Sequence, residues 1–319
     1  MLSWFKHKVK KIALIYYLLE LKKRWLYKHY EKVYDDKTFI CMLYRKANHG
    51  CDPNLENPVL FTEKLQWLKL YYRHPDIPIC SDKVEAKKYI AEHGFPQLVI
   101  PTIATYEHAS QIDLDALPEN FILKASHGSG WNIICRGNKK QIDWKHARKT
   151  MDVWLSENLY RLGREWNYKE QKPMLLAEEL LDDITVVDYK FLCFNGRCRA
   201  MQVNHEIDGE KFVDLYDRDW KLFDDMGTGV APHSKKPIPK PPQFEQMRKI
   251  AEVLAQPFPF VRVDLYNVKG HIYFGEMTFF PGSGFWTITP PERNRQFGDW
   301  LILPDSTDCF VRNLSENIQ

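Results

Sequence analysis

The sequence lacks a hydrophobic run long enough to form a transmembrane helix. Its longest uninterrupted apolar stretch covers residues 12–19, whereas a membrane-spanning helix needs roughly 20 apolar residues. The seven cysteines are scattered without a CxxC pair, which argues against zinc fingers and disulfide scaffolds and favours a reducing compartment. Glu20 and basic residues follow the apolar run, where a signal peptide would have small residues. We therefore expect a cytoplasmic protein.

The sequence also lacks the short motifs of several enzyme classes. It contains no HExxH zinc-protease motif, no GxSxG nucleophile motif and no Walker A phosphate loop. A strong excess of one charge is absent too, because 45 basic side chains stand against 42 acidic ones. The basic excess lies in residues 1–34, and the remaining chain is slightly acidic, so we expect no nucleic-acid partner.

The sequence begins with a basic amphipathic segment, residues 1–34. Apolar residues at three- and four-residue steps predict a helix with one apolar stripe: Leu2, Phe5, Val9, Ile12, Tyr16 and Leu19. Such a helix can bind an anionic membrane surface through residues 1–30, which would place the protein at the inner face of the membrane. It can equally pack on the rest of the fold with its basic face solvated.

Helical and extended patterns alternate after residue 35. Apolar side chains at helical spacing predict a helix over residues 61–72, with Thr62 as its cap. A second helix is predicted at residues 82–90, capped by Ser81, and a third at residues 144–159. Strands are predicted at residues 98–100, 121–124 and 133–135.

Two β-hairpins are predicted in the second half of the chain. The first turns at Asn195-Gly196, a strong hairpin signal, and the second joins strands at residues 260–266 and 271–279. A Gly/Pro-rich stretch at residues 227–242 is either a connection to the helix at 244–255 or a flap over a site. Helices mixed with antiparallel hairpins predict an α+β fold.

A small-residue loop follows a lysine at the end of one predicted strand. Lys124 precedes Ala-Ser-His-Gly-Ser-Gly, and glycines allow backbone N–H groups to approach a phosphate closely. A plain β-turn explains the same residues, so the loop alone does not establish phosphate binding.

Two carboxylates lie on the strands of the second hairpin. Side chains alternate along a strand, so Arg262 and Asp264 share one face, and Glu276 and Thr278 share another. A two-residue turn at 268–269 would put the two pairs on opposite faces, whereas a three-residue loop or one bulge would bring Arg262 opposite Glu276. Two facing carboxylates can hold Mg²⁺ together with phosphate oxygens, although surface ion pairs have the same spacing.

These motifs occur in the order found in ATP-grasp enzymes, and the chain resembles the TupA-like (teichuronopeptide-type) ATP-grasp proteins over roughly residues 35–305. The motifs that carry the resemblance are Phe61-Thr62-Glu63-Lys64-Leu65-Gln66-Trp67, Ser81-Asp82-Lys83, the Lys124 loop, Ala177-Glu178-Glu179-Leu180-Leu181, Asp188-Tyr189-Lys190-Phe191 and Gly298-Asp299-Trp300. The resemblance implies an ATP-grasp fold in which two α+β subdomains grip ATP. The expected division is a basic helical extension (1–34), an N-terminal helical and mixed region (35–80), a first subdomain (81–175) and a second subdomain (176–319).

The same resemblance implies roles for individual residues toward ATP. Lys83 and Lys124 would contact its phosphates, and the flexible cover would contain Ser126, His127, Gly128, Ser129 and Gly130. The hinge beside adenine would contain Glu178, Glu179 and Leu181, and Asp182 or Asp183 would reach the ribose.

The resemblance also implies a reaction centre with Mg²⁺ as second cofactor. Lys190 would bind phosphate, and Arg262 would stabilise the transferring phosphoryl group and the tetrahedral oxyanion. Asp264 and Glu276 would hold Mg²⁺, with Thr278 where many ATP-grasp enzymes have Asn. Apart from the resemblance, Gly282-Ser283-Gly284 either simply turns the chain after the hairpin or shapes the acceptor pocket, and Arg161, Arg164 and Lys169 either form a solvated basic face or bind an acidic sugar.

The function implied is an ATP-dependent carboxylate–amine ligase that forms a C–N bond through an acyl phosphate. Its substrates would be a carboxylate sugar, a uronic acid by family context, and an amine, in the assembly of a capsule or other surface polysaccharide. A glycosyltransferase is the alternative because Asp217-Arg218-Asp219 is an Asp-x-Asp, although the motif resembles a solvated turn. A nucleotide-binding module without activity is the third alternative.

Overall fold

The computed structural model describes residues 22–48, 50–181, 187–207, 209–234, 236–305 and 307–312. Most of the predicted amphipathic helix, residues 1–21, lies outside the described residues. Residues 22–33 are helical and pack on the fold: Tyr27 and Tyr30 contact the ring of Phe39, and Arg24 pairs with Glu157 at 2.9 Å. Among the described residues, no helix is long and apolar enough to cross a bilayer.

A four-stranded antiparallel sheet forms the first layer. Its strand order is β1-β4-β2-β3, from β1 (Thr102–Tyr106), β2 (Asn120–Ala125), β3 (Asn132–Arg136) and β4 (Leu175–Glu179). The helix α6 (Trp144–Ser156) packs on it through Met151 and Trp154, which share a core with Phe121 and Leu123. The alternating burial of β2 reflects a strand with one face toward this core.

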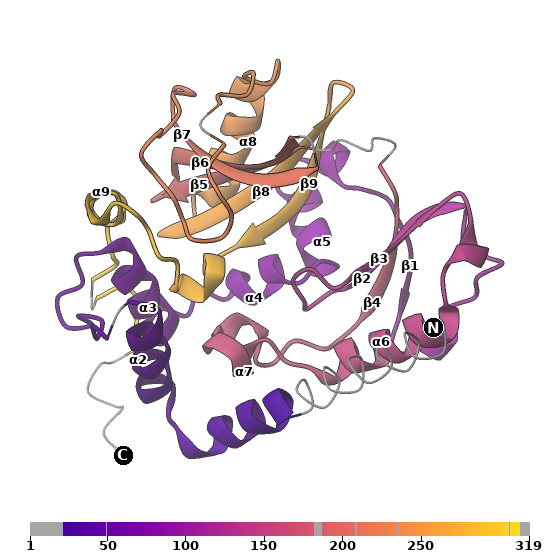
Figure 1. The fold of residues 1–319 in the computed structure, drawn as a ribbon, viewed down its shortest axis with the longest axis horizontal. Helices are drawn as coiled ribbons and strands as arrows, with labels where there is room; N and C mark the ends of the chain where they lie inside the picture. Colours follow the sequence, from indigo (N-terminus) through magenta and orange to yellow (C-terminus); the bar gives the residue numbers. More distant parts are fainter. Residues whose placement is uncertain are drawn as a thin grey trace, which may run out of the picture.

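A five-stranded antiparallel sheet forms the second layer, above the first sheet in Figure 1. Its order is β7-β6-β5-β8-β9, from β5 (Asp188–Phe194), β6 (Arg197–Ile207), β7 (Glu210–Asp217), β8 (Phe260–Val268) and β9 (His271–Thr278). The large core on this sheet includes α3 (Phe61–Tyr71), α4 (Asp76–Ser81), α5 (Glu85–Glu92), α8 (Phe244–Ala255) and α9 (Pro291–Trp300). The helix α2 (Asp36–Ala47) packs beside α3, and the short α7 (Tyr160–Gly163) precedes β4.

The described elements confirm the predicted α+β class, but several local predictions were wrong. Leu98 ends a 3-10 turn, and the first strand begins only at Thr102, after Pro101. The predicted caps also differ. Leu60 precedes α3, with Glu63 accepting its amide at 2.9 Å, and Asp82, rather than Ser81, accepts the amides that begin α5.

Elements from different predicted segments pack together in the structure. Strand β4, which begins at the predicted boundary and runs through 176–179, belongs to the first sheet, whereas α5 of the first predicted subdomain packs in the core of the second sheet. The division into four segments stays a prediction.

Both predicted hairpins form, and a bulge sets the register of the second. Asn195-Gly196 and Lys269-Gly270 are two-residue turns with positive φ at both positions. Leu265 pairs with Phe274 but Asp264 pairs with Glu276, so Gly275 is an extra residue. The bulge puts the two carboxylates on one face. It places Arg262 opposite Thr278, where the sequence predicted Glu276.

Gly298 allows α9 to approach the start of α3. A Cβ at this position would lie 2.0 Å from the Val59 carbonyl oxygen, which is backbone and cannot rotate away. We expect Gly298→Ala to lower the free energy of unfolding by about 1–3 kcal/mol because overpacking forces backbone shifts. Urea unfolding would measure the change. Asp299→Ala on the exposed side of α9 is the control, and equal stability of the two variants would contradict the prediction.

Candidate active site

The residues predicted at the reaction centre converge on the hairpin of β8 and β9. The Arg262 guanidinium donates to both Asp264 oxygens at 2.7 and 2.8 Å and to Glu276 Oε1 at 2.9 Å. Thr278 Oγ1 lies 3.0 Å from both Arg262 Nη2 and Glu276 Oε1. The alternation of β8 and the bulge at Gly275 put these four side chains on one face.

Two lysines from other elements complete this cluster. Lys190 on β5 pairs with Asp264, its neighbour in register on β8, and with Asp188 at 2.5 Å. Lys83, between α4 and α5, donates to the Gly128 carbonyl and lies 3.9 Å from Glu276 Oε2. Lys83 therefore links the glycine loop of the first sheet to a carboxylate of the second.

Burial and the neighbouring cations have opposite effects on the pKa values of the two carboxylates. Burial raises the pKa of Asp264 to about 6, although Arg262 and Lys190 act in the other direction. Burial would also raise the pKa of Glu276, but Lys83, Arg262 and Lys190 together lower it to about 2. The carboxylates therefore balance a dense group of cations within a largely buried site.

A second group of charges lies on the first sheet around Glu178 of β4. Its carboxylate pairs with Lys124 of β2 and Lys87 of α5, both at 2.5 Å, and Glu178 is 3% exposed. Burial would raise the pKa of Glu178, but the two ammonium groups lower it below its ordinary value. Glu178 thus holds the predicted phosphate lysine Lys124 in place.

Tyr266 of β8 is close enough to both charge groups to interact with their carboxylates. Burial raises the pKa of its phenol first, and the negative charges of Asp188, Asp264, Glu276 and Glu178 raise it further. Sequence reasoning missed Tyr266, although it shares a strand face with Arg262 and Asp264. Sequence reasoning also missed Lys87, because no motif pointed to it. Asp188 was part of a quoted motif but received no role.

Some residues of the glycine loop lie in the core, and others line the cleft. Ser126 and His127 are buried, and His127 Nε2 lies 3.0 Å from the Trp154 carbonyl oxygen, while burial lowers its pKa. Gly128 and Ser129 line the cleft, and Gly130 is exposed. A Cβ on Gly128 would lie 2.1 Å from the Trp131 ring, so this packing requires glycine.

The cleft between the glycine loop and β9 has a volume of about 250 Å³. Arg262, Glu276 and Thr278 line it together with Gly128 and Ser129. The segment that contains α7 and the turn after β9 supply its other lining residues: Leu159, Leu162, Glu165, Tyr168, Phe280, Gly282 and Ser283. The cleft therefore adjoins the predicted reaction centre.

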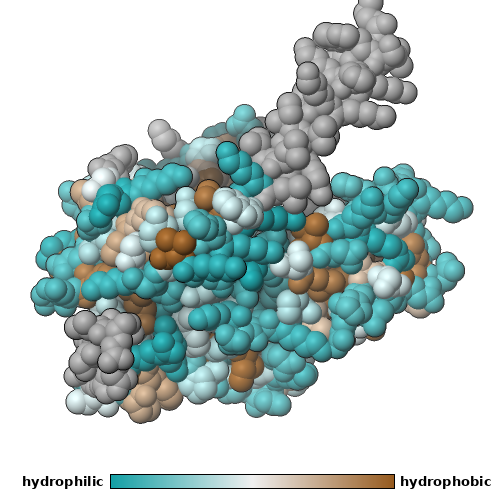
Figure 2. Space-filling view, turned by 90° about the horizontal axis from the view of Figure 1, so that it is seen from below, coloured by the Kyte–Doolittle hydropathy of each residue, from teal (hydrophilic) through white to brown (hydrophobic). Residues whose placement is uncertain are grey.

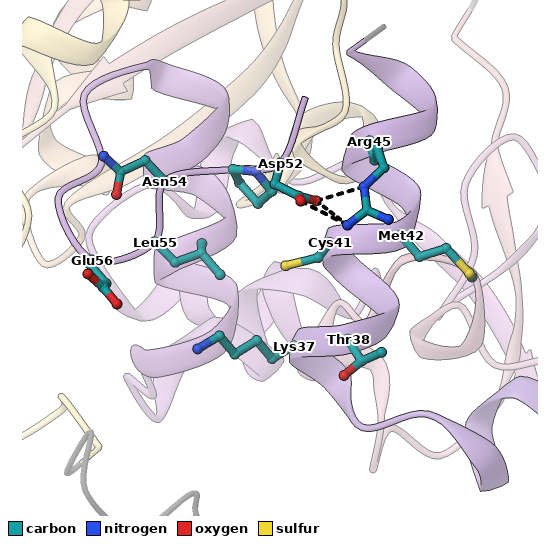
Figure 3. A pocket seen from close by; sticks show the side chains of 10 residues that line it. Lys37, Thr38, Cys41, Met42, Arg45, Asp52, Asn54, Leu55 and Glu56 are labelled. Atoms are coloured by element: carbon teal, nitrogen blue, oxygen red, sulfur yellow. Dashed lines mark hydrogen bonds and ion pairs between the residues drawn. The ribbon is translucent and has the colours of Figure 1, made fainter. Parts of the chain in front are cut away.

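A larger hollow of about 640 Å³ lies elsewhere, between α2 and the loop at residues 52–56. Figure 3 shows Arg45 paired with Asp52 at this hollow, with Cys41 and Leu55 facing each other across it. Its lining contains none of the residues predicted to bind ATP or metal.

The remaining predicted residues either do not line the cleft or lie outside the described residues. Glu179 is exposed, Leu181 is partly exposed, and Asp183 lies outside the described residues. Arg161 pairs with Glu31 at 2.7 Å. Arg164 forms an ion pair with Asp36, and the Lys169 ammonium lies over the ring of Tyr160. Asp217 accepts hydrogen bonds from amides of its own turn.

The oxygen ligands at the hairpin fit Mg²⁺. Asp264 and Glu276 face each other in register, and the Thr278 hydroxyl lies beside them. In the described ranges no three His, Cys, Asp or Glu side chains form a metal cluster by themselves. Mg²⁺ commonly uses one or two carboxylates together with phosphate oxygens and water, so this pair is sufficient.

Two antiparallel sheets that direct lysines, an arginine and paired carboxylates toward a glycine loop define a protein of the ATP-grasp type. The chain belongs to the TupA-like ATP-grasp family, whose model matches residues 63–302. Membership confirms the predicted family and the ATP-grasp fold.

Solved structures similar to this chain include several ligases. An L-amino acid ligase from Bacillus licheniformis is 12% identical with a TM-score of 0.44, over 70% of this chain and 49% of its own. A D-alanine-D-alanine ligase from Helicobacter pylori is 14% identical with a TM-score of 0.39, over 76% of this chain and 69% of its own. The ATP-grasp ligase PsnB complexed with minimal precursor, Mg and ADP is 13% identical with a TM-score of 0.38, over 70% and 60%. The chain thus spans about half the length of the first of these. No curated protein matches the sequence.

Proposed function

We propose that this protein is an ATP-dependent carboxylate–amine ligase that works through an acyl phosphate. The observation that supports the proposal is the convergence of Lys83, Lys190 and Arg262 on Asp264 and Glu276, beside the glycine loop. Cations fixed next to paired carboxylates suit a Mg²⁺-bound triphosphate, in which negative charge must be stabilised during phosphoryl transfer.

The chemistry has two balanced steps. A carboxylate oxygen attacks the γ-phosphorus of ATP, the bond to the β-phosphate oxygen breaks, and ADP leaves. An amine nitrogen then attacks the acyl carbon, phosphate leaves with its electron pair, and the nitrogen loses a proton to give an amide. Bound Mg²⁺ would neutralise charge on the phosphate oxygens.

The chain's own residues have separate roles in these steps. Lys83, Lys124 and Lys190 would hold phosphate oxygens, and Asp264 and Glu276, with Thr278 beside them, would hold the metal. The Arg262 guanidinium, which donates hydrogen bonds to both carboxylates in the structure, would stabilise the phosphoryl group and the tetrahedral oxyanion. The hinge residues Glu178 to Leu181 would lie beside adenine.

The finer proposal concerns the substrates. By family context we propose a uronic acid as carboxylate, and amidation of a surface polysaccharide or its precursor as the biological reaction. Incubation with ATP, Mg²⁺, uronic acids and amines should release ADP fully only when acid and amine are both present, with a product of matching mass. Release of UDP from a UDP-sugar, or ATP binding without turnover on any acid, would contradict the ligase proposal.

We also propose that the N-terminal basic segment binds anionic membranes. The described helix 22–33 carries Lys22, Lys23, Lys28 and Lys32, and the face in Figure 2 is largely hydrophilic with scattered small apolar groups. Attraction of about 1 kcal/mol for each cation near the surface would then contribute much of the binding. Removal of residues 1–21 together with replacement of these four lysines by Gln should weaken sedimentation with anionic vesicles at low salt and leave the fold intact. Unchanged sedimentation would contradict the proposal.

A further inference from the structure

The lining of the cleft beside β9 combines groups of opposite charge. Arg262 of β8 lines it at the reaction centre, together with Glu276, which also interacts with Lys83. Glu165 is a second acidic lining residue and belongs to the segment around α7, which also supplies the apolar side chains of Leu159 and Leu162. A substrate in this cleft therefore meets cations beside the β8–β9 hairpin and a carboxylate on the α7 segment.

A buried lysine holds the backbone segment that carries Glu165. Lys69 of α3 is 1% exposed and donates to the Gly163 carbonyl at 2.8 Å and to the Ser283 carbonyl at 2.6 Å. The Ser283 hydroxyl donates to Glu165. Gly282, Ser283 and Gly284 all have positive φ, and Lys69 thus ties this strained turn to the segment that carries Glu165.

We propose that the α7 side of the cleft receives the amine substrate of the ligase and that the Glu165 carboxylate binds its ammonium group. This inference rests on the function proposed above. Lys69 interacts with Glu165 but is buried and bonded to two backbone carbonyls, and Arg161 and Arg164 are paired with Glu31 and Asp36. Glu165 is therefore the charged group of this segment that lines the cleft, and the carboxylate substrate belongs beside Arg262.

The electrostatics and the shape of the cleft support the same orientation. Burial raises the pKa of Glu165 although Lys69 acts in the other direction, and an incoming cation would stabilise the ionised carboxylate further. Leu159, Leu162 and Phe280 offer an apolar surface for the rest of the molecule, and Leu162 is 41% exposed. A volume of about 250 Å³ limits the amine to a small molecule. The class inferred is a small primary amine with an apolar portion.

A two-readout assay tests the assignment. Hydroxylamine is uncharged at neutral pH and traps acyl phosphates as hydroxamates, so its reaction reports the first step. Amide formation with methylamine, butylamine or ethanolamine, on whichever uronic acid gives hydroxamate, reports capture of an ammonium ion. For Glu165→Gln we expect the KM for butylamine to rise about tenfold or more relative to wild type, and the ratio of amide to hydroxamate to fall equally. Glu170→Gln, an exposed change in the same segment, is the control.

The outcomes separate this inference from the proposed function. An unchanged amine KM in Glu165→Gln, or equal loss of hydroxamate and amide, would overturn the assignment of Glu165. Absence of hydroxamate from the wild type with every acid would instead remove the ligase function, and the inference with it.

A variant on the exposed side of the cleft keeps the test available if Glu165→Gln does not fold. Leu162→Lys places a positive charge beside Glu165 and should raise the KM for butylamine about tenfold. Leu162→Gln, which has no charge, should raise it less than threefold. Equal effects of the two substitutions would overturn the electrostatic basis of the inference.

Discussion

Replacing Asp264 with Asn is expected to abolish Mg²⁺- and ATP-dependent turnover and also to destabilise the fold. Asp264 is 1% exposed and its carboxylate balances Arg262 and Lys190. Its removal takes away a proposed metal ligand and leaves the buried cations Arg262 and Lys190 with one carboxylate partner each, Glu276 and Asp188. Breaking such a buried pair costs about 3–5 kcal/mol, and we expect a loss of about 3 kcal/mol in the free energy of unfolding.

Urea unfolding and ADP release on the same samples would measure both effects. Glu276→Gln should likewise abolish turnover, with a smaller loss of stability because its side chain is 33% exposed. Asp219→Asn is the matched control, since Asp219 is exposed in the turn that contains the Asp-x-Asp motif. Unchanged turnover in both site variants would refute the metal assignment, and UDP release from a UDP-sugar that is lost in Asp219→Asn would favour a glycosyltransferase.

Replacing Glu178 with Gln should weaken both the first sheet and the binding of ATP. The substitution leaves Lys87 and Lys124 without a countercharge in a site where their side chains are 12% and 20% exposed. Some hydration remains available to these lysines, so we expect a loss of about 2 kcal/mol, below the cost for fully buried pairs. Lys124 would no longer be held on β2, and the KM for ATP should rise about tenfold.

The pH dependence of stability provides an independent check on Glu178. The folded state lowers the pKa of this carboxyl below its ordinary value of 4.5, so its stabilising effect is complete above that pH. The effect is lost as pH falls through the lowered pKa. The stability difference between wild type and Glu178→Gln should therefore be largest near pH 7 and should shrink below about pH 4. Glu179→Gln, the exposed neighbour, should show no difference at either pH.

The sequence alone predicted those features that depend on local periodicity and turn chemistry. Asn195-Gly196 specified a tight turn, and strand alternation placed Arg262 on the same face as Asp264. It also predicted that a bulge could bring Asp264 and Glu276 to one face. The order of the motifs was sufficient to identify the ATP-grasp family, which the family match confirms.

Only the tertiary structure decided which distant residues meet. The bulge at Gly275 fixed the register, and sheet pairing joined Lys190 to Asp264 across 74 positions. The pairing of Glu178 with Lys87, and the anchoring of the Glu165 segment by Lys69, likewise depend on α5 and α3 packing against strands and turns far away in sequence. Local preferences determine the face on which a side chain lies, whereas burial of the whole core determines what lies opposite it.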